Sequence, residues 1–286
     1  MPTLKKSSVM KMFTDGEKYF TELRWKDKTK TCIRCNANIV YTLSSGRLRC
    51  KKCGLTFGNF TRTYLGKLNV PIYEIAHLLY LFALGIPVYR ARYYVLVSMK
   101  TAHKAYTVFR EALYDTSVQD FYRKLKENPE LEQELKSYFC DIDNFAWGTN
   151  DRSIIIGFVE IDGNVYIFPV SGENYTSLCE QNKIKELRSG LQYVRQDCYI
   201  GKLSIVGSHL SIPRVSDEEK TRHTNKKIPK LWNYLRKHLY IYHGISISHH
   251  HLFLKELEFR FNNRDQEIFT LLSEQLVKKV SSHSNN

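Results

Sequence analysis

Four cysteines in two pairs are the residues of this 286-residue sequence whose types and spacing point most directly to chemistry. Cys32 and Cys35 form one Cys-x-x-Cys pair, and Cys50 and Cys53 form a second pair after fourteen intervening residues. Two such pairs predict a structural Zn²⁺ site in which four thiolates surround one ion, as in a zinc ribbon. The alternatives are a redox-active pair and cysteines whose spacing is fortuitous.

Two acidic residues form a second candidate site. Asp141 and Asp143 lie in a predicted strand over residues 137–145 and are separated by one residue, so both carboxylates point to the same face of a sheet. The rest of this strand is rich in aromatic and aliphatic residues, and a buried carboxylate without compensation is costly. A divalent cation would compensate the charge, so the pattern favours a metal site with oxygen ligands.

Two more polar residues follow later in the chain. Asp197 comes at the end of another apolar strand, and Asn225 ends a His-Thr-Asn sequence that opens a predicted helical segment. A second interpretation of Asp197 stays open, because its carboxylate could lie in solvent or pair with Arg195 or Lys202. Asn225 could likewise belong to an ordinary polar helix start.

The charge of the chain is concentrated in its first part. Residues 1–110 hold 20 Lys and Arg against 5 Asp and Glu, whereas residues 111–286 hold 23 against 24. A basic segment ahead of a neutral body predicts a polyanionic partner, nucleic acid before membrane. The sequence has no run of about eighteen apolar residues and no hydrophobic signal core after Met1, so we expect a soluble intracellular protein with no membrane partner.

The elements that must position these residues divide the chain into five parts. They are a basic N-terminal segment (1–30), a zinc ribbon (31–60), an all-α helix-turn-helix (70–116), an acidic helical spacer (117–136) and an α/β domain (137–280). In the last part, strand patterns alternate with helical ones, which predicts an α/β layered domain. Its predicted strands include 153–161 and 164–170, joined as a hairpin by an Asp162-Gly163 turn, and 193–199.

The third helix of the segment 70–116 carries the candidate DNA contacts. Apolar periodicity predicts helices over residues 72–82, 88–95 and 99–115, with a short turn before the last one and Ser98 as its N-cap. The side chains of the last helix predicted to face DNA are Lys100, His103, Lys104, Thr107 and Arg110, and those predicted to face the core are Ala102, Tyr106, Phe109 and Leu113. The alternative is the solvated face of a purely structural three-helix unit.

The order of these motifs carries a family resemblance. A zinc ribbon, a helix-turn-helix, Asp141-Ile142-Asp143-Asn144, Asp197 and then His223-Thr224-Asn225 resemble insertion-sequence transposases of the ISXO-like group, relatives of the eukaryotic Merlin transposons. Further positions that match the family pattern are Gly148, Trp232, the segment 242–249 and the segment 259–264. The similarity runs from about Cys32 to Arg264.

The resemblance implies an RNase H-like catalytic domain, with a mixed sheet and flanking helices. In this family an Asp, Asp and Asn or Glu triad binds two Mg²⁺ or Mn²⁺ ions, and the triad corresponds here to Asp143, Asp197 and Asn225. Two such ions catalyse in-line phosphoryl transfer on DNA. The implied partners are double-stranded DNA at the element ends and target, and further copies of the chain on that DNA. The location would be the cytoplasm and nucleoid of a prokaryote or the nucleus of a eukaryote.

Two departures from the family pattern support a different function class. Asn144 replaces an acidic residue that follows the first Asp in the family, and Ile228 stands where the family often has Glu three residues after the Asn. The alternative is therefore a catalytically inactive or domesticated transposase-derived protein that binds DNA. A third interpretation is an RNase H-like nuclease that cuts RNA or structured DNA without joining ends.

Overall fold

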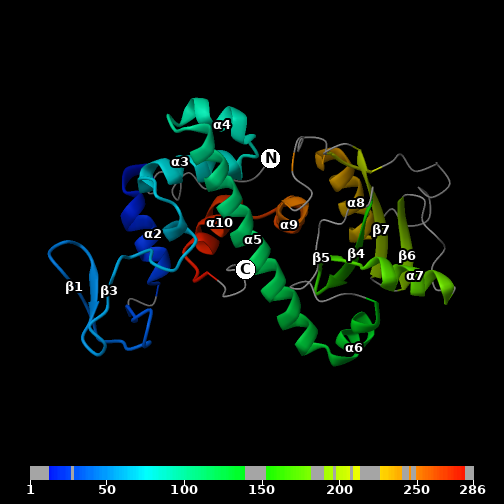
Figure 1. Cartoon of the computed structure of the whole chain (residues 1–286), viewed down its shortest axis with the longest axis horizontal. Helices are drawn as coiled ribbons and strands as arrows, with labels where there is room; N and C mark the ends of the chain where they lie inside the picture. The colour runs from blue at the N-terminus through cyan, green and yellow to red at the C-terminus, as the bar shows by residue number, and fades with distance from the viewer. Residues whose placement is uncertain are drawn as a thin grey trace. The chain divides into compact units, whose positions relative to one another are not determined.

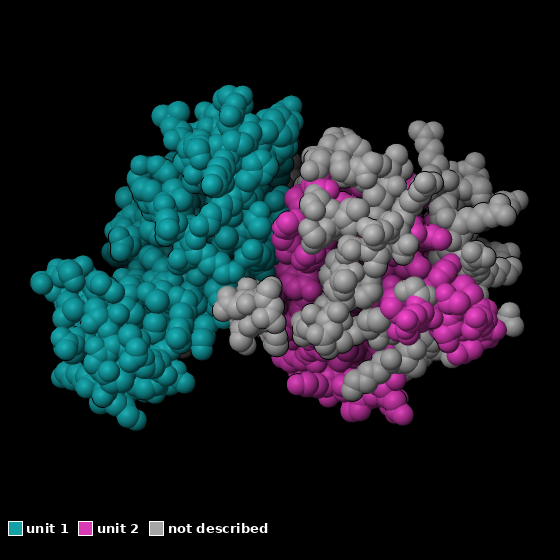
Figure 2. All heavy atoms as spheres, viewed as in Figure 1, with its two compact units in different colours: residues 1–113, 263–286 teal, residues 114–262 magenta. Residues whose placement is uncertain are grey.

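A computed structural model describes most of the chain in two compact units. The described residues are 13–26, 29–138, 153–181, 190–195, 198–206, 209–212, 226–239, 245 and 249–280. Unit 1 comprises residues 1–113 and 263–286, and unit 2 comprises residues 114–262 (Figure 2). Within these ranges, no helix combines the length and apolar composition needed to cross a bilayer.

The four cysteines lie in a small antiparallel sheet of unit 1. Its strands are β1 (Val40–Thr42), β2 (Leu48–Cys50) and β3 (Thr56–Phe57), in the order β1-β2-β3 (Figure 1). A core this small has few apolar side chains to bury, and its fully buried residues include Leu48 and Phe57 beside two of the cysteines. Small domains of this kind usually depend on a metal or disulfides for stability.

Helices form the rest of unit 1. They are α2 (Gly16–Arg24), α3 (Ile72–Ala83), α4 (Val88–Tyr94), the first half of α5 (Met99–Glu127) and α10 (Ile268–Leu276), with a short 3₁₀ turn η1 (Leu65–Lys67) before α3. The predicted helices over 72–82 and 88–95 are confirmed. Ser98 caps α5 as predicted, because its hydroxyl accepts the Thr101 N–H at 3.0 Å.

The third predicted helix is longer than expected. Helix α5 continues past the predicted end near Asp115 to Glu127, because no Gly or Pro interrupts the sequence before Pro129. Pro129 then opens α6 (Pro129–Tyr138), where the missing N–H of proline costs nothing. The predicted acidic spacer is therefore the second half of α5 followed by α6. Ser137 and Tyr138, expected to begin a strand, end α6 instead.

Helix α10 packs in unit 1, although the sequence analysis placed residues 137–280 in one domain. Its buried Phe269 stacks on Tyr19 of α2, with ring centroids 6.2 Å apart, and lies edge-on to Tyr80 of α3 at 6.5 Å. Leu272 and Leu276 continue the same buried face. The apolar stripe predicted the helix, but the partner of that stripe is set by tertiary packing.

A five-stranded sheet is the centre of unit 2. The strands are β4 (Ser153–Ile161), β5 (Asn164–Pro169), β6 (Gly190–Arg195), β7 (Cys198–Val206) and β8 (His209–Ser211). The order is β5-β4-β7-β6, with β8 also paired to β7, and every described pairing is antiparallel.

Of the predicted strand boundaries in this sheet, one hairpin agrees with the structure and one strand differs. The predicted hairpin between β4 and β5 is confirmed: Asp162 and Gly163 both have positive φ, 47° and 78°, as a two-residue type I′ turn requires. The strand predicted over residues 193–199 is instead divided between β6 and β7, which pair antiparallel.

Helices cover both faces of this sheet. Alternation along β4 places Ile154, Ile156 and Phe158 against α8 (Lys227–His238) and α9 (His250–Asn262). Val159 and Ile161 face the opposite side, where the second half of α5, α6 and α7 (Gly172–Glu180) pack. The α/β layered architecture is therefore confirmed, with an antiparallel rather than mixed set of described strands.

Candidate functional site

The first cysteine pair lies in a tight turn shaped by backbone hydrogen bonds. The Cys32 N–H donates to the carbonyl of Ala37 at 2.9 Å, and the Asn36 N–H donates to the carbonyl of Cys32 at 3.0 Å. Asn36 has a φ of 54°, a left-handed conformation that Asn tolerates better than most residues. The Arg34 N–H points at the Cys32 Sγ at 3.4 Å. The turn thus aims backbone donors at a ligand sulfur.

The second pair lies in a turn of the same construction. The Cys50 N–H donates to the carbonyl of Leu55 at 3.0 Å, and the Gly54 N–H donates to the carbonyl of Cys50 at 3.0 Å. Gly54 has a φ of 71° and occupies the position that Asn36 holds in the first turn. An Asn or Gly directly after the second cysteine of each pair was a further sequence signal for two equivalent metal-binding turns.

The four sulfurs converge on one point. The Sγ atoms of Cys32 and Cys53 are 3.5 Å apart, those of Cys35 and Cys50 are 3.6 Å apart, and all four lie within 4.8 Å of one another. A tetrahedral ion with Zn–S bonds of about 2.3 Å places its sulfurs roughly 3.8 Å apart. The donor set and its dimensions therefore fit Zn²⁺. Among the described residues, no other group of three or more metal-ligand side chains is close enough to share an ion.

The electrostatics of the thiols favour a cation between them. Burial opposes ionisation of Cys32, but hydrogen bonds from the Cys35 and Arg34 N–H groups and from neighbouring thiols lower its pKa to about 6. The Ala37 N–H favours the thiolate of Cys35, yet burial and the adjacent sulfurs raise its pKa to about 11. One thiolate thus suppresses ionisation of the next. A divalent ion removes that repulsion and allows four thiolate ligands.

The predicted DNA contacts of α5 divide into an exposed group and a buried residue. Lys100, His103 and Lys104 are exposed on the first two turns, and Thr107 is half-buried. Arg110 is only 8% exposed, and its guanidinium lies over the rings of Phe82 at 5.4 Å and Tyr106 at 5.7 Å. The residues predicted to face the core, Ala102, Tyr106, Phe109 and Leu113, are all buried.

Arg110 therefore differs in position from the other predicted contacts. Its side chain covers aromatic core residues of α3 and α5, where cation–π contact and packing of its aliphatic stem stabilise the helices. The exposed group that the structure places together is Lys100, His103 and Lys104.

Helix α4 presents a surface that the sequence analysis did not single out. Of its seven residues only Ala91 is buried. Tyr89, Tyr93 and Tyr94 are 51%, 69% and 72% exposed, and the Arg92 guanidinium lies 4.6 Å from the Tyr93 ring centroid. The run Val-Tyr-Arg-Ala-Arg-Tyr-Tyr was the available signal, because a short helix with one buried position must expose its aromatic and basic residues. We call the exposed Tyr and Arg side chains of residues 88–94 the α4 surface.

The candidate catalytic residues have no described geometry. Asp143, Asp197 and Asn225 all lie outside the described residues, as do Asp141 and the His-Thr part of the motif at 223–224.

Two other positions of the family pattern do have structural partners. Trp232 is buried in unit 2, edge-on to Phe158, and it lies so close to β7 that a Cβ at Gly201 would come within 2.5 Å of its ring. Asn262 and Glu258 of α9 both hydrogen-bond to the backbone of β5. The motif residues Trp232 and Asn262 thus position α8 and α9 against the sheet, and Glu258, which lies just before the motif, adds a contact.

Comparison with known proteins gives one local similarity. A stretch of 51 residues is 41% identical to an uncharacterized transposase-like protein of Haemophilus influenzae, which amounts to 18% of this chain and 42% of that protein. No protein-family model matches the chain, and no solved structure matches it. The similarity supports a relationship to transposases at a general level.

Proposed function

We propose that this protein is a transposase that binds the terminal inverted repeats of a mobile element and catalyses metal-dependent DNA cleavage and strand transfer. The local similarity to a transposase-like protein carries the proposal. The four-cysteine site and the exposed basic turns of α5 support it, because structural zinc modules and exposed helical cations both occur in DNA-binding proteins.

In this proposal α4 and α5 act as a helix-turn-helix. Side chains near the N-terminus of a recognition helix reach base edges, and neighbouring cations contact phosphates. Lys100, His103 and Lys104 would contact the major groove and its backbone. The α4 surface would contact the adjacent backbone through its arginines and tyrosine hydroxyls.

The zinc ion would have a structural role. Four cysteine ligands leave no open coordination position, so the ion would hold the two turns together and take no part in the reaction. Burial of two ligands, Cys32 and Cys50, partial burial of the other two, and the small apolar core around them support this role.

The catalytic part of the proposal depends on the resemblance of the motifs. Asp143, Asp197 and Asn225 would hold two Mg²⁺ or Mn²⁺ ions, which activate the attacking oxygen and stabilise the leaving oxygen during phosphoryl transfer. Joining two element ends requires that they be held together, so the active form would be an assembly of at least two chains on DNA. It would act in the nucleoid of a prokaryote or the nucleus of a eukaryote.

A cleavage and joining assay tests the proposal. Purified protein is incubated with the DNA that flanks its own gene and with Mg²⁺ or Mn²⁺, beside Asp143→Ala and Asp197→Ala. We expect nicked or joined products that both variants fail to form while they still bind DNA. Product formation unchanged in both variants would contradict the assignment of these residues.

The second candidate is an inactive transposase-derived DNA-binding protein. The observation that favours it is the sequence at Asn144 and Ile228, where the family pattern has acidic residues. Specific, salt-sensitive binding without any product in either metal would establish this function instead.

A further inference from the structure

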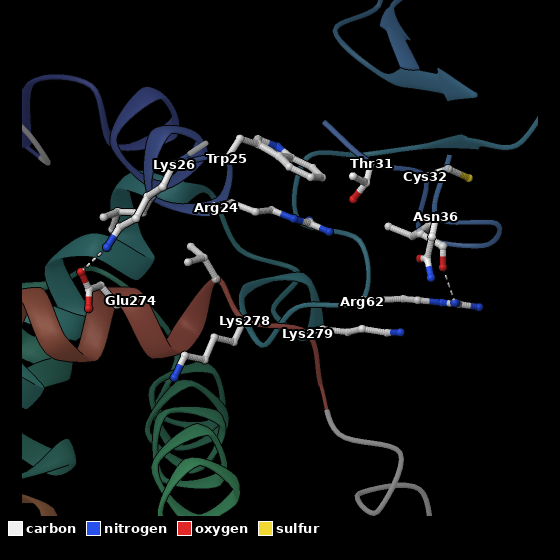
Figure 3. A pocket seen from close by; sticks show the side chains of 13 residues that line it. Arg24, Trp25, Lys26, Thr31, Cys32, Asn36, Arg62, Glu274, Lys278 and Lys279 are labelled. Atoms are coloured by element: carbon white, nitrogen blue, oxygen red, sulfur yellow. Dashed lines mark hydrogen bonds and ion pairs between the residues drawn. The ribbon is translucent and has the colours of Figure 1, made fainter. Parts of the chain in front are cut away.

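Unit 1 contains an open pocket beside the first cysteine turn. It has a volume of about 410 Å³. Its walls come from the end of α2, the turn that starts at Cys32, the segment before η1 and the end of α10 (Figure 3). The pocket therefore brings the end of α10 beside segments from the first 62 residues of the chain. Its size is in the range of small-ligand sites, about 300–1,000 Å³.

The lining of this pocket is strongly cationic. Among the described residues that line it, five carry a positive charge, one is a carboxylate, and Cys32 is one of the thiolate ligands of the four-cysteine site, so the positive charges remain in excess. The cations are Arg24, Lys26, Arg62, Lys278 and Lys279, and the carboxylate is Glu274. Like charges repel when they gather in a concave site, so an excess of this kind favours an anionic ligand.

Two of the cations are held beside each other by the backbone. The Val280 N–H donates to the carbonyl of Arg62 at 3.0 Å, and Thr63 pairs with Lys279 in an isolated β-bridge. Arg62 has a φ of 60°, which is uncommon for a residue with a side chain, and its guanidinium donates to the carbonyl of Ile33 at 2.8 Å. In Figure 3 the side chains of Arg62 and Lys279 extend in the same direction.

Neither of these two cations is neutralised by a described carboxylate. The ion pairs within the described residues include none with Arg62 or Lys279, whereas Lys26 pairs with Glu274 at 2.5 Å. Guanidinium and ammonium groups that keep free N–H donors bind phosphate oxygens well. The pocket thus has donors available without breaking an existing ion pair.

Arg24 and Trp25 form the opposite wall. The Arg24 guanidinium lies 4.8 Å from the Trp25 ring centroid and donates to the backbone carbonyls of Asn59 and Thr61. Burial lowers the pKa of Arg24 to about 10, so the group stays charged at neutral pH. Among the described residues its partners are two backbone carbonyls and an aromatic ring and include no carboxylate, so its charge adds a favourable field for an anion.

We propose that this pocket binds a phosphate group of the DNA backbone, as a second contact of unit 1 beside the one made by α5. The inference depends on the proposed DNA binding but not on catalysis. Phosphate is the anion that fits best, because an excess of cations in an open pocket matches a polyanion whose charge continues beyond the pocket. The same chemistry would also accept inorganic phosphate.

Salt-dependent DNA binding by the full-length protein tests the pocket. Lys279→Gln removes an exposed ammonium, so the negative slope of log K against log salt should become shallower by about 0.9. The affinity should fall about three- to tenfold at moderate salt. Glu274→Gln removes the one described carboxylate of the lining and should strengthen binding. Lys126→Gln, an exposed lysine of α5 in unit 2, is the matched control and should change neither quantity.

The outcomes separate this inference from the proposed function. If Lys100→Gln weakens binding while Lys279→Gln behaves like Lys126→Gln, α5 binds DNA and the pocket proposal is wrong. If the wild type binds no DNA, the proposed function fails. Titration of the wild type and Lys279→Gln with inorganic phosphate, followed by tryptophan fluorescence, then decides the ligand. Phosphate binding lost in the variant would assign the pocket to free phosphate, and no binding would overturn the site.

Discussion

The side-chain amide of Asn262 forms two hydrogen bonds with the backbone of Val165: its Oδ1 accepts from the Val165 N–H at 3.0 Å, and its Nδ2 donates to the Val165 carbonyl at 2.8 Å. One turn earlier in α9, Glu258 accepts from the Ile167 N–H at 2.6 Å. Four helical residues rise about 6.0 Å and two strand residues about 6.8 Å, so the spacings match. Helix α9 thus pairs with the edge of the described sheet through side chains.

This contact predicts a stability cost for Asn262→Ala. The change leaves the N–H and carbonyl of Val165 without their partner in a partly buried setting, so we expect a loss of about 1–3 kcal/mol in the free energy of unfolding. Urea denaturation measures it. Asn233→Ala on the exposed face of α8 is the control, and equal effects of the two changes would show that the edge contact contributes nothing.

Zinc content tests the cysteine site. We expect one zinc ion per wild-type chain and loss of that ion in Cys50→Ser, because three thiolates and a hydroxyl bind zinc more weakly than four thiolates. Unit 1 should lose ordered structure with the metal, since structural zinc contributes about 10–16 kcal/mol in small modules. Cys179→Ser, on α7 in unit 2, should keep the ion. Full zinc retention in Cys50→Ser would contradict the assignment.

Replacing two basic residues of α5 should separate DNA contact from packing. Lys104→Gln should weaken DNA binding severalfold and leave the melting temperature unchanged, because Lys104 is exposed. Arg110→Gln should lower the melting temperature and leave the salt slope of binding unchanged, because its guanidinium lies over Phe82 and Tyr106. If Arg110→Gln instead changed the salt slope and left the melting temperature unchanged, Arg110 would be a DNA contact.

The dependence of protein stability on pH in the acidic range should depend on Asp120. Burial raises the pKa of this carboxyl, but hydrogen bonds from Tyr166 and Arg123 and the charge of Lys124 lower it below its usual value. Its contribution to stability is therefore complete above the pKa of the unfolded chain, about 4, and is lost as the pH falls through the lower folded pKa. Asp120→Asn should flatten the stability profile in that range, measured by thermal unfolding at several pH values.

The control for this profile is Glu130→Gln, which removes an exposed carboxyl of α6. It should leave the pH dependence as in the wild type. An unchanged profile in Asp120→Asn would assign the acid transition to other carboxyls.

A buried ion pair in unit 2 should lose more stability when one partner is removed than when both are replaced by apolar residues. Lys255 and Glu258 are 1% and 2% exposed, the Lys255 Nζ lies 2.8 Å from the Glu258 Oε2, and Ser117 bonds to both. Burial lowers the pKa of Lys255, so its charge depends on Glu258. Glu258→Ala should cost about 3–5 kcal/mol because it leaves the lysine buried without its partner. The double change Glu258→Leu with Lys255→Met should be milder in the same urea measurement, because it removes the unpaired lysine, although both variants lose the bond from the Ile167 N–H.

Local signals predicted much of unit 1. The spacing of Cys32, Cys35, Cys50 and Cys53 was sufficient for the four-sulfur cluster, because a Cys-x-x-Cys turn fixes two ligands by itself. Apolar periodicity was sufficient for α3 and α4. Periodicity could not predict that Arg110 is buried. Arg110 lies at the border between the buried and exposed faces of α5, and residues on other helices decide whether such a side chain is covered.

The remaining packing and strand pairing could not be predicted, because they depend on residues that are distant in sequence. Nothing in the sequence near Phe269 indicates that α10 packs on α2 and α3. The pairing of β4 with β7, and of Asn262 with Val165, likewise depends on which apolar faces meet in three dimensions. The catalytic triad predicted at Asp143, Asp197 and Asn225 stays a prediction.

The packing of α10 has a consequence during protein synthesis. Its residues leave the ribosome after all of unit 2, yet their buried side chains complete the helical core around α2 and α3. At about 5–20 residues per second, helix α3 waits roughly 10–40 seconds for this last helix. Nascent unit 1 therefore exposes an apolar surface until translation is nearly finished, and fragments that stop before residue 263 should be prone to aggregate.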